Sequence, residues 1–479
     1  MVLGAVRMDG FAFDTHGSAS RIETVMGEIK RRIAARSLTP GAKLPSVRGF
    51  AKVMRVSTST VVEAYERLVA EGAIRSRPGS GFYVASTLAP LSLSEIGPKL
   101  DRAIDPFWVS RLALDGKADM AKPGCGWMPA SWMPQEVLRR AMRTVSRGDA
   151  QHLSEYSTPL GLLPMRQLLS RRLSEQGVHA GAEQIILVDS GTQAIDLLCR
   201  FLLEQGQTVL VDDPCYFNFH ALLRAHRVNV VGVPYTPTGP DVALFEQALS
   251  EHQPRLYITN SAIHNPTGAA LSPVTAHRVL MLAERANLTI IEDDIFADFE
   301  EQRAPRLTTF DGLNRVVQIG SFSKTLSASV RCGYIVPPKD WIEPLTDLKI
   351  AAHFSGSQLS EALVYSALKD GHYRRHMDAL KARLSRVRIE TIAKLSTLGI
   401  TPWIEPQAGL FLWCRLPTGV DAAAVARYAL TKHIVLAPGQ IFSQSTDAGR
   451  YMRFNVSQCE GADLFEILQE TLISAQTNS

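Results

Sequence analysis

Five polar clusters between residues 190 and 324 carry residue types that together suit one kind of chemistry. They are Ser190-Gly191-Thr192, Asp213-Pro214, Asn265-Pro266, Asp293-Asp294 and Ser321 to Lys324. A lysine that is shielded from water can form a Schiff base with an aldehyde. A carboxylate keeps a pyridine nitrogen protonated, while hydroxyls, an arginine and a glycine at a helix start bind a phosphate. Pyridoxal 5′-phosphate (PLP) is the one cofactor that requires all of these groups at once, so the clusters predict a PLP site.

The five clusters follow apolar runs that are typical of buried strands. The runs are IILVDS, TVLVDDP, RLYITN, LTIIEDD and VVQIGSF, and helical stretches separate them, one of which is expected to start at Phe219. Such alternation predicts a mostly parallel sheet covered by helices, and ligands of these sheets lie at the carboxyl ends of the strands. Taken singly, Asp293 could cap a helix, Tyr216 could lie in a core and Arg331 could pair with any acid. The ordered set favours one shared site.

Composition and charge exclude several classes of protein. The chain has 479 residues, of which 46% are hydrophobic, and this length and composition predict two or three globular domains. The net charge of +4 is small and does not require a nucleic-acid or membrane partner. Neither a run of about eighteen apolar residues nor a signal-peptide pattern occurs, so we expect no membrane span and no export. The six cysteines lack CxxC or metal-ligand spacing. We therefore expect reduced thiols, no metal site and a cytoplasmic location.

Positive charge is concentrated near the start of the chain. Residues 20–85 contain twelve Lys and Arg residues against five acidic residues, the local excess that nucleic-acid binding requires. RIETVMGEIKRRIAARSL, SVRGFAKVM and STSTVVEAYERLVAEGAI are predicted to form helices, and IRSRPGSGFYVAS a hairpin. Three helices, a tight turn between the last two and a basic hairpin predict a winged helix-turn-helix. Lys30, Arg31 and Arg32 are expected to be solvated helix charges rather than specific contacts.

The order LPSVR, VSTSTVVEAYERL and GSGFYV closely resembles the GntR class of bacterial repressor domains. The resemblance implies operator binding, in which the arginine after LPS and the start of the third helix touch DNA and the wing glycines approach the minor groove. The DNA-binding residues implied are Arg48, Thr58, Ser59, Thr60, Gly79 and Gly81. GntR domains often have arginine early in the third helix, where this chain has Thr58, so a different base preference is expected. A winged fold that mediates protein contacts is the alternative.

About 350 residues of the C-terminal part resemble class I aminotransferases of fold type I. The resemblance implies that Lys324 in SFSK forms the aldimine with PLP and that Asp293 in IIEDD pairs with the pyridine nitrogen. It implies that Asn265 in HNPTG donates to the ring 3′-oxygen and that Tyr216 in DPCYF stacks on the ring. The implied phosphate-binding residues are Gly191, Thr192, Ser321, Ser323 and Arg331.

Three further assignments follow from the same resemblance. Tyr156 in YSTPLG matches a tyrosine that reaches the phosphate of the partner subunit, so a homodimer is implied. Arg453 in YMRFNV matches the arginine that binds a substrate α-carboxylate. Phe296 stands where aminotransferases usually have a tyrosine whose hydroxyl bonds the ring 3′-oxygen. The absence of that hydroxyl mildly disfavours efficient turnover.

A GntR-type region followed by an aminotransferase-like region resembles the architecture of the MocR family of bacterial regulators. The expected fold is an N-terminal α+β winged helix-turn-helix and a C-terminal α/β, fold-type I PLP-dependent aminotransferase-like domain with a smaller α+β subdomain. The expected boundaries are 18–86 for the DNA-binding domain, 87–115 for a linker, 116–355 for the PLP-binding large domain and 356–479 for the small domain.

Three functions are compatible with these residues. The first is a transcription regulator that binds operator DNA and senses PLP or an amino compound through the Lys324 aldimine. The second is an active aminotransferase that also carries a DNA-binding head. The third is a PLP-binding scaffold with neither turnover nor a specific operator. The presence of Lys324, Asp293 and Arg453 does not separate the first two, because sensing can use the same chemistry.

Overall fold

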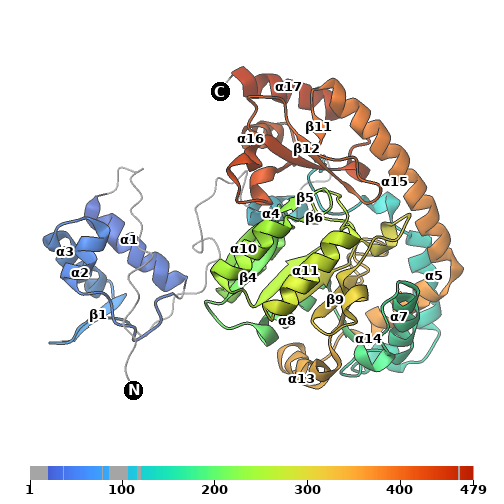
Figure 1. The fold of residues 1–479 in the computed structure, drawn as a ribbon, viewed down its shortest axis with the longest axis horizontal. Helices are drawn as coiled ribbons and strands as arrows, with labels where there is room; N and C mark the ends of the chain where they lie inside the picture. Colours follow the sequence, from blue (N-terminus) through green and yellow to red (C-terminus); the bar gives the residue numbers. More distant parts are fainter. Residues whose placement is uncertain are drawn as a thin grey trace. The chain divides into compact units, whose positions relative to one another are not determined.

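The computed structural model describes residues 20–35, 37–77, 79–85, 106–115, 120–461 and 464–477 (Figure 1). The chain divides into two compact units, Met1–Leu100 and Asp101–Ser479. Each unit has an apolar core of its own. Across the described residues, no helix combines the length and the apolar character needed to cross a membrane.

The N-terminal unit has the predicted winged helix-turn-helix fold. Its elements are α1 (Arg21–Ala34), α2 (Val47–Met54), α3 (Thr58–Ala70), β1 (Ile74–Arg77) and β2 (Gly81–Val84). Each helix begins after a serine whose hydroxyl accepts a backbone amide of the first turn, because the first amides of a helix lack internal partners. Apolar side chains at helical spacing from all three helices meet in one core with Ile74 and Val84 of the hairpin.

The C-terminal unit is built on an eight-stranded sheet with the order β3-β10-β9-β8-β7-β4-β5-β6. In that order the strands span Ile186–Val188, Gly333–Val336, Val316–Ser321, Thr289–Asp293, Leu256–Thr259, Thr208–Asp213, Asn229–Thr236 and Gly239–Pro240. The five strands β9, β8, β7, β4 and β5 are parallel to one another, whereas β10 and β6 pair antiparallel. The predicted mostly parallel sheet is therefore correct.

Helices cover both faces of this sheet because its strands are apolar on both sides. In β4, for example, Val209 and Val211 pack with α8 (Gly191–Leu202) and α9 (Phe217–His226). Leu210, between them, packs on the other face with α10 (Val242–His252) and α11 (Pro273–Arg285), as Figure 1 shows for the last two helices. The helix predicted to start at Phe219 begins two residues earlier, at Phe217.

The rest of the unit consists of helices and a small antiparallel sheet of order β11-β12-β14-β13. These strands span Thr401–Pro402, Phe411–Arg415, Tyr451–Asn455 and Ala437–Pro438, and the helices α16 (Ala422–Thr431) and α17 (Leu464–Thr477) accompany them. The long α15 (Gly371–Thr397) follows α14 (Gln358–Lys369), which packs on α5 (Gln135–Ser146) and α7 (Leu163–Glu175). The remaining helices are α4 (Pro106–Asp115), α6 (Gln151–Ser154), α12 (Leu307–Asp311) and α13 (Ile342–His353).

Candidate functional site

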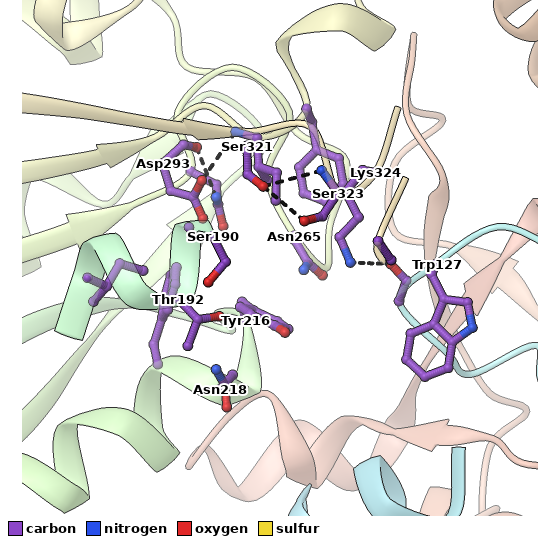
Figure 2. Close-up of a pocket in the computed structure, with 18 of the residues that line it drawn as sticks. Trp127, Ser190, Thr192, Tyr216, Asn218, Asn265, Asp293, Ser321, Ser323 and Lys324 are labelled. Carbon is purple, nitrogen blue, oxygen red and sulfur yellow. Dashed lines mark hydrogen bonds between the residues drawn. The ribbon is translucent and has the colours of Figure 1, made fainter. Parts of the chain in front are cut away.

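A cavity of about 400 Å³ opens at the carboxyl ends of the central strands (Figure 2). β4, β7, β8 and β9 reach it through the residues that end or follow them, as the order of the polar clusters predicts. Nine residues that the sequence predicts for PLP line this one cavity: Gly191, Thr192, Tyr216, Asn265, Asp293, Ser321, Ser323, Lys324 and Arg331.

One end of the cavity carries groups suited to an anion. α8 begins at Gly191, and the hydroxyl of Ser190 accepts a backbone amide of the first turn over 3.1 Å. The remaining free amides of this turn and the helix dipole favour a negative charge. The hydroxyls of Ser321 and Ser323 lie 3.0 Å apart, and the exposed Arg331 contributes a cation. This donor set matches what a phosphate monoester requires.

Lys324 is half-buried, and its amine donates to the carbonyl oxygen of Gly126 over 2.6 Å. Burial lowers the pKa of Lys324 to about 8, and the positive charge of Arg453 is the second cause. At pH 7 about a tenth of this side chain is therefore the neutral amine, against fewer than roughly one in a thousand for an ordinary lysine. The side chain is thus prepared to act as a nucleophile toward a carbonyl carbon.

Asp293 ends β8 and is buried beside the cavity. Burial raises the pKa of Asp293 to about 6, although the Ile295 amide, which donates to Oδ1 over 3.2 Å, opposes the rise. Asn260 fixes the strand end by donating to the carbonyl oxygen of Asp293 over 3.0 Å. The carboxyl group is mostly ionised at pH 7 and gains strongly from a cationic partner such as a protonated ring nitrogen, because it is poorly hydrated.

The side walls of the cavity are aromatic. The ring of Tyr216, just before α9, packs edge-on against Phe219 at a centroid distance of 5.5 Å. Phe296 is 4% exposed and lies nearly perpendicular to Phe411 at 5.6 Å. Figure 2 shows the Trp127 indole beside the end of the Lys324 side chain. A flat heteroaromatic ring fits such walls, because stacked and edge-on contacts are available on several sides.

Arg453 on β14 is fully buried and does not itself line the cavity. Its Nη1 donates to Asn265 Oδ1 over 3.0 Å and its Nη2 to the carbonyl oxygen of Gly124 over 2.7 Å. The rings of Phe411 and Phe442 lie 4.3 and 4.6 Å from the guanidinium carbon. Its Nε has no hydrogen-bond partner, and within the described ranges no acidic side chain pairs with it. Burial lowers the pKa of Arg453 to about 10.

Tyr156 lies outside this cavity. Its side chain is 77% exposed and packs edge-on against Phe354, itself 60% exposed, at a centroid distance of 4.9 Å. Leu153 and Leu359 are exposed as well. The assigned role of Tyr156 requires a second subunit and stays a prediction.

Sequence reasoning missed several lining residues: Leu114, Lys122, Gly126, Trp127, Asn218 and Asn260. Asn260 was within reach of the argument, because it ends the predicted strand RLYITN just as Ser190, named in a polar cluster, ends IILVDS. Gly126 gave no signal, since it contributes a backbone carbonyl rather than a side chain. Trp127 lies in a stretch, KPGCGWMP, that carries no strand or helix pattern.

The N-terminal unit exposes most of the side chains predicted to contact DNA. Arg48 lies in the first turn of α2, and α2 packs on α3. The hydroxyl of Ser57, the N-cap of α3, lies 2.8 Å from that of Ser59 and 2.7 Å from that of Thr60. Arg48, Thr58 and Ser59 are exposed, and Thr60 is half-buried. A polar helix start of this kind suits contacts with phosphates and base edges.

The wing turns at Gly79 and Gly81, whose φ angles are 70° and 112°. Side chains rarely adopt these angles, so glycine is required there. The wing also pairs with the turn before α2, because Lys43 forms a β-bridge with Tyr83. A bare backbone at the tip permits close approach to a groove.

Acidic residues neutralise part of the positive charge of this unit. Arg31 and Arg32 each pair with Glu28 at 2.7 Å, and Lys30 pairs with Glu71 at 2.6 Å. Cations that lack an acidic partner within the described ranges include Arg48, Lys52 and Arg75. Among the described residues, unpaired charge therefore lies on α2 and β1, and on α1 at Arg21.

Two family models match the chain. The model described as "Aminotransferase class I and II" matches residues 129–469, well over half of the chain. The model described as "Bacterial regulatory proteins, gntR family" matches residues 21–84. Regulators of the gntR family bind DNA, and class I and II aminotransferases are PLP-dependent.

Relatives with the same combination align over nearly the whole chain. YdfD, an HTH-type transcriptional regulator of Bacillus subtilis (strain 168), is 29% identical over 450 residues, 91% of this chain and 92% of the relative. NorG, an HTH-type transcriptional regulator of Staphylococcus aureus (strain USA300), is 28% identical over 413 residues, 84% of this chain and 92% of the relative.

Solved structures show the fold of the C-terminal unit. The structure of LysN, the α-aminoadipate aminotransferase of Thermus thermophilus, was solved in complex with N-(5′-phosphopyridoxyl)-L-leucine. LysN is 23% identical to this chain, with a TM-score of 0.70, and the match covers 81% of this chain and 100% of the LysN chain. An archaeal alanine:glyoxylate aminotransferase is 23% identical, with a TM-score of 0.72 over 78% of this chain and 96% of its own. With a gntR-type DNA-binding region ahead of a fold-type I aminotransferase domain, the chain belongs to the class I and II aminotransferase family and, within it, to the MocR family of transcription regulators.

Proposed function

We propose that this regulator holds PLP in the cavity around Lys324 and changes its binding to operator DNA in response to PLP or an amino compound. One observation carries the proposal. A single cavity gathers a lysine of lowered pKa, a buried carboxylate and a cluster of phosphate-type donors at the ends of neighbouring strands. Perturbed ionisable groups in one cavity are characteristic of functional sites.

The residues present fit PLP. Its phosphate would be held by the start of α8 with Thr192, Ser321, Ser323 and Arg331, where hydroxyls and a cation converge. Asp293 would hold the proton of the ring nitrogen, because its ionised carboxyl needs a cationic partner. When bound, PLP supplies an aldehyde that combines with amines and a ring that accepts electrons.

Lys324, Asn265 and Tyr216 complete the proposed arrangement. The amine of Lys324 attaches the cofactor, since part of it is unprotonated at neutral pH. Asn265 orients the ring through its side-chain amide, whose oxygen already accepts from Arg453. Tyr216 provides a flat surface for the ring.

Arg453 is the proposed anchor for the effector's carboxylate. It is a buried cation without an acidic partner in the described part of the chain, and its Nε is unsatisfied. A carboxylate compensates such a cation well, because two parallel charge-assisted hydrogen bonds form. An α-amino carboxylate is therefore the favoured class of effector.

A homodimer is part of the proposal. Tyr156 and Phe354 expose large aromatic surfaces side by side, together with Leu153 and Leu359. Apolar clusters of this kind usually mark interfaces. In the dimer, Tyr156 would reach the phosphate site of the partner subunit.

The domain boundaries also belong to this proposal. They are 18–86 for the DNA-binding domain, 87–115 for the linker, 116–355 for the PLP-binding large domain and 356–479 for the small domain.

A DNA-binding assay on the promoter region of the chain's own gene tests the proposal. Fluorescence anisotropy is measured with the full chain freed of PLP, with PLP, and with PLP plus each common α-amino acid, while keto-acid formation is recorded in the same samples. We expect specific binding whose affinity changes when PLP or one amino acid is added, and no such change in Lys324→Ala. Affinity that is identical in every sample would contradict ligand sensing, and rapid keto-acid formation would favour the aminotransferase function.

A further inference from the structure

The segment Pro123–Trp127, named here the glycine strap, is a turn and bend in which the carbonyl groups of residues 124–127 all accept hydrogen bonds from side chains. The carbonyl oxygens of Gly124 and Gly126 accept from Arg453 over 2.7 Å and from Lys324 over 2.6 Å. Those of Cys125 and Trp127 accept from the Asn455 amide over 3.1 and 2.9 Å. One short segment therefore joins both cations of the site to the small sheet.

Gly124 is needed for this arrangement, whereas Gly126 leaves a small space beside both cations. A Cβ at Gly124 would lie 2.4 Å from the backbone carbon of Leu436, which excludes any side chain. A Cβ at Gly126 would lie 3.6 Å from Lys324 Nζ and 3.9 Å from Arg453 Nη2, which is ordinary contact distance. The space beside Gly126 is thus within reach of both cations. One carbon atom placed there would be in contact with both side chains.

The hydrogen bond between Arg453 and the strap leaves the neighbouring Nε–H of the guanidinium without a partner. Nε and Nη2 form one edge of a guanidinium, and a carboxylate binds both at once. Arg306 shows this in the same chain: its Nε and Nη2 donate to the two oxygens of Asp294 over 2.8 and 3.1 Å. In Arg453 the same edge holds only the Gly124 carbonyl on Nη2, while Nε has no partner. A neutral carbonyl therefore occupies half of a carboxylate site.

We propose that the glycine strap is the element that senses an α-amino carboxylate, because the effector's carboxylate must displace the Gly124 carbonyl from Arg453. The inference rests on the proposed function, since it assumes that PLP and its ligands bind around Lys324. The exchange is favourable, because two charge-assisted bonds replace one bond to a neutral oxygen and satisfy Nε. Nη1 keeps its bond to Asn265 throughout.

The backbone amides of the strap and the lining of the cavity connect the strap with neighbouring segments of the C-terminal unit. Within the strap, the backbone amide of Gly124 donates to the carbonyl oxygen of Val435 over 2.9 Å, and the amide of Cys125 donates to the carbonyl oxygen of Lys122 over 3.0 Å. Leu114, at the end of α4, lines the same cavity. α4 is the last helix before the strap and follows the sequence that joins the two units. The cavity that Gly126 and Trp127 of the strap line is therefore also lined by the end of α4.

Two stable ligands that differ only in the carboxylate provide the test. They are N-(5′-phosphopyridoxyl)-L-leucine and N-(5′-phosphopyridoxyl)-3-methylbutylamine, added to the full chain freed of PLP. We expect the leucine compound to bind roughly tenfold or more tightly by calorimetry, in line with a hydrogen-bonded charge pair. Hydrogen exchange over residues 121–127 should become faster with the leucine compound and stay unchanged with the amine compound.

Three variants separate the strap from its surroundings. Gly126→Ala places a methyl group in the space beside both cations, so the preference for the leucine compound should fall roughly tenfold. Gln458→Ala removes the hydrogen bond that the Gln458 side-chain amide donates to the Trp127 carbonyl over 3.1 Å. Because the strap is then easier to displace, the leucine compound should bind about two- to tenfold more tightly. Gly371→Ala is the control, because its Cβ would meet nothing within 4 Å.

The outcomes are distinct. If neither compound binds, the proposed PLP site is wrong and the inference is lost with it. If both bind with equal affinity, or if exchange over residues 121–127 does not respond to the carboxylate, the PLP site stands and the strap is not the sensor. A Gly126→Ala protein that keeps the full preference for the leucine compound also overturns the inference.

Discussion

The guanidinium of Arg453 and the side-chain amide of Asn265 are joined directly, with Nη1 donating to Oδ1 over 3.0 Å. Arg453 belongs to the four-stranded sheet, and Asn265 follows β7 of the eight-stranded sheet. The anchor proposed for the effector therefore holds the residue proposed to orient the cofactor ring. The positive charge of Arg453 also lowers the pKa of Lys324.

Capture of PLP by the ligand-free protein should depend on pH through Lys324. The neutral amine is the nucleophile, so the rate of appearance of visible absorbance should rise with pH to a midpoint near 8, where the lowered pKa of Lys324 lies. In Arg453→Gln the midpoint should move upward, because a nearby positive charge is lost. Arg388→Gln, which alters another buried arginine that is no cause of this shift, should leave the midpoint in place. A downward movement in Arg453→Gln would contradict the assignment.

Lys324→Ala should abolish covalent retention of PLP while the protein stays folded. Lys349 offers a matched control, because burial lowers its pKa as well and its amine donates to a carbonyl, that of Pro159, over 2.7 Å. Lys349 lies outside the cavity, so Lys349→Ala should retain PLP. The check is borohydride reduction followed by peptide mapping. A pyridoxyl group found on any lysine other than Lys324 would refute this role.

Asp293→Asn should stabilise the ligand-free protein at pH 7 and weaken PLP binding. The pKa of Asp293 is raised from 3.8 to about 6, so the folded state binds more protons than the unfolded state between these values. Stability contributed by this residue therefore falls as pH rises through that window, and the full penalty is present above pH 6. Removing it should raise the free energy of unfolding at pH 7 by up to about 3 kcal/mol. Urea unfolding at pH 4 and pH 7 checks the sign, since most of the gain should be lost at pH 4.

Phe296→Tyr should lower the midpoint in a pH titration of the visible absorbance of the PLP-loaded protein. Phe296 lines the cavity, and a tyrosine hydroxyl there could donate to the ring 3′-oxygen. A donor to that oxygen stabilises its deprotonated form and so favours loss of the proton at lower pH. A midpoint that is unchanged or raised would show that Phe296 does not adjoin the 3′-oxygen.

Arg48→Ala should weaken binding to a mapped operator, by about 1–3 kcal/mol if the arginine reads a base. A pure phosphate contact would instead weaken all DNA sequences alike and reduce the salt dependence. Arg31→Ala is the control, because Arg31 already pairs with Glu28 at 2.7 Å and should contribute little. Equal losses in the two variants would argue that Arg48 has no specific contact.

Much of this architecture could be predicted from short-range patterns. The spacing of apolar residues located all three helices of the N-terminal unit, because the buried face of a helix is encoded locally. The cavity could be predicted because parallel strands end at one edge, so residues as distant in sequence as Gly191 and Lys324 meet there.

The rest depends on information that side-chain types do not carry. Gly124 and Gly126 contribute carbonyl groups, and no residue pattern marks a carbonyl that binds a cation. The covering of Arg453 by the strap results from packing between segments more than 300 residues apart. The role predicted for Tyr156 requires a second subunit, and the position of that subunit is not encoded in any local pattern of the sequence.

Cys125, at the centre of the glycine strap, gives the strap a chemical reporter of its own. Its thiol is buried, donates to the Trp127 carbonyl over 3.3 Å and has a pKa raised by burial. A thiol of this kind reacts with an alkylating reagent only while the backbone around it is open. The labelling rate of Cys125, resolved by mass spectrometry from the five other buried cysteines, therefore measures how often the strap opens in the intact regulator. A signal in the small molecule's binding site can thus be followed on operator-bound protein, without any engineered probe.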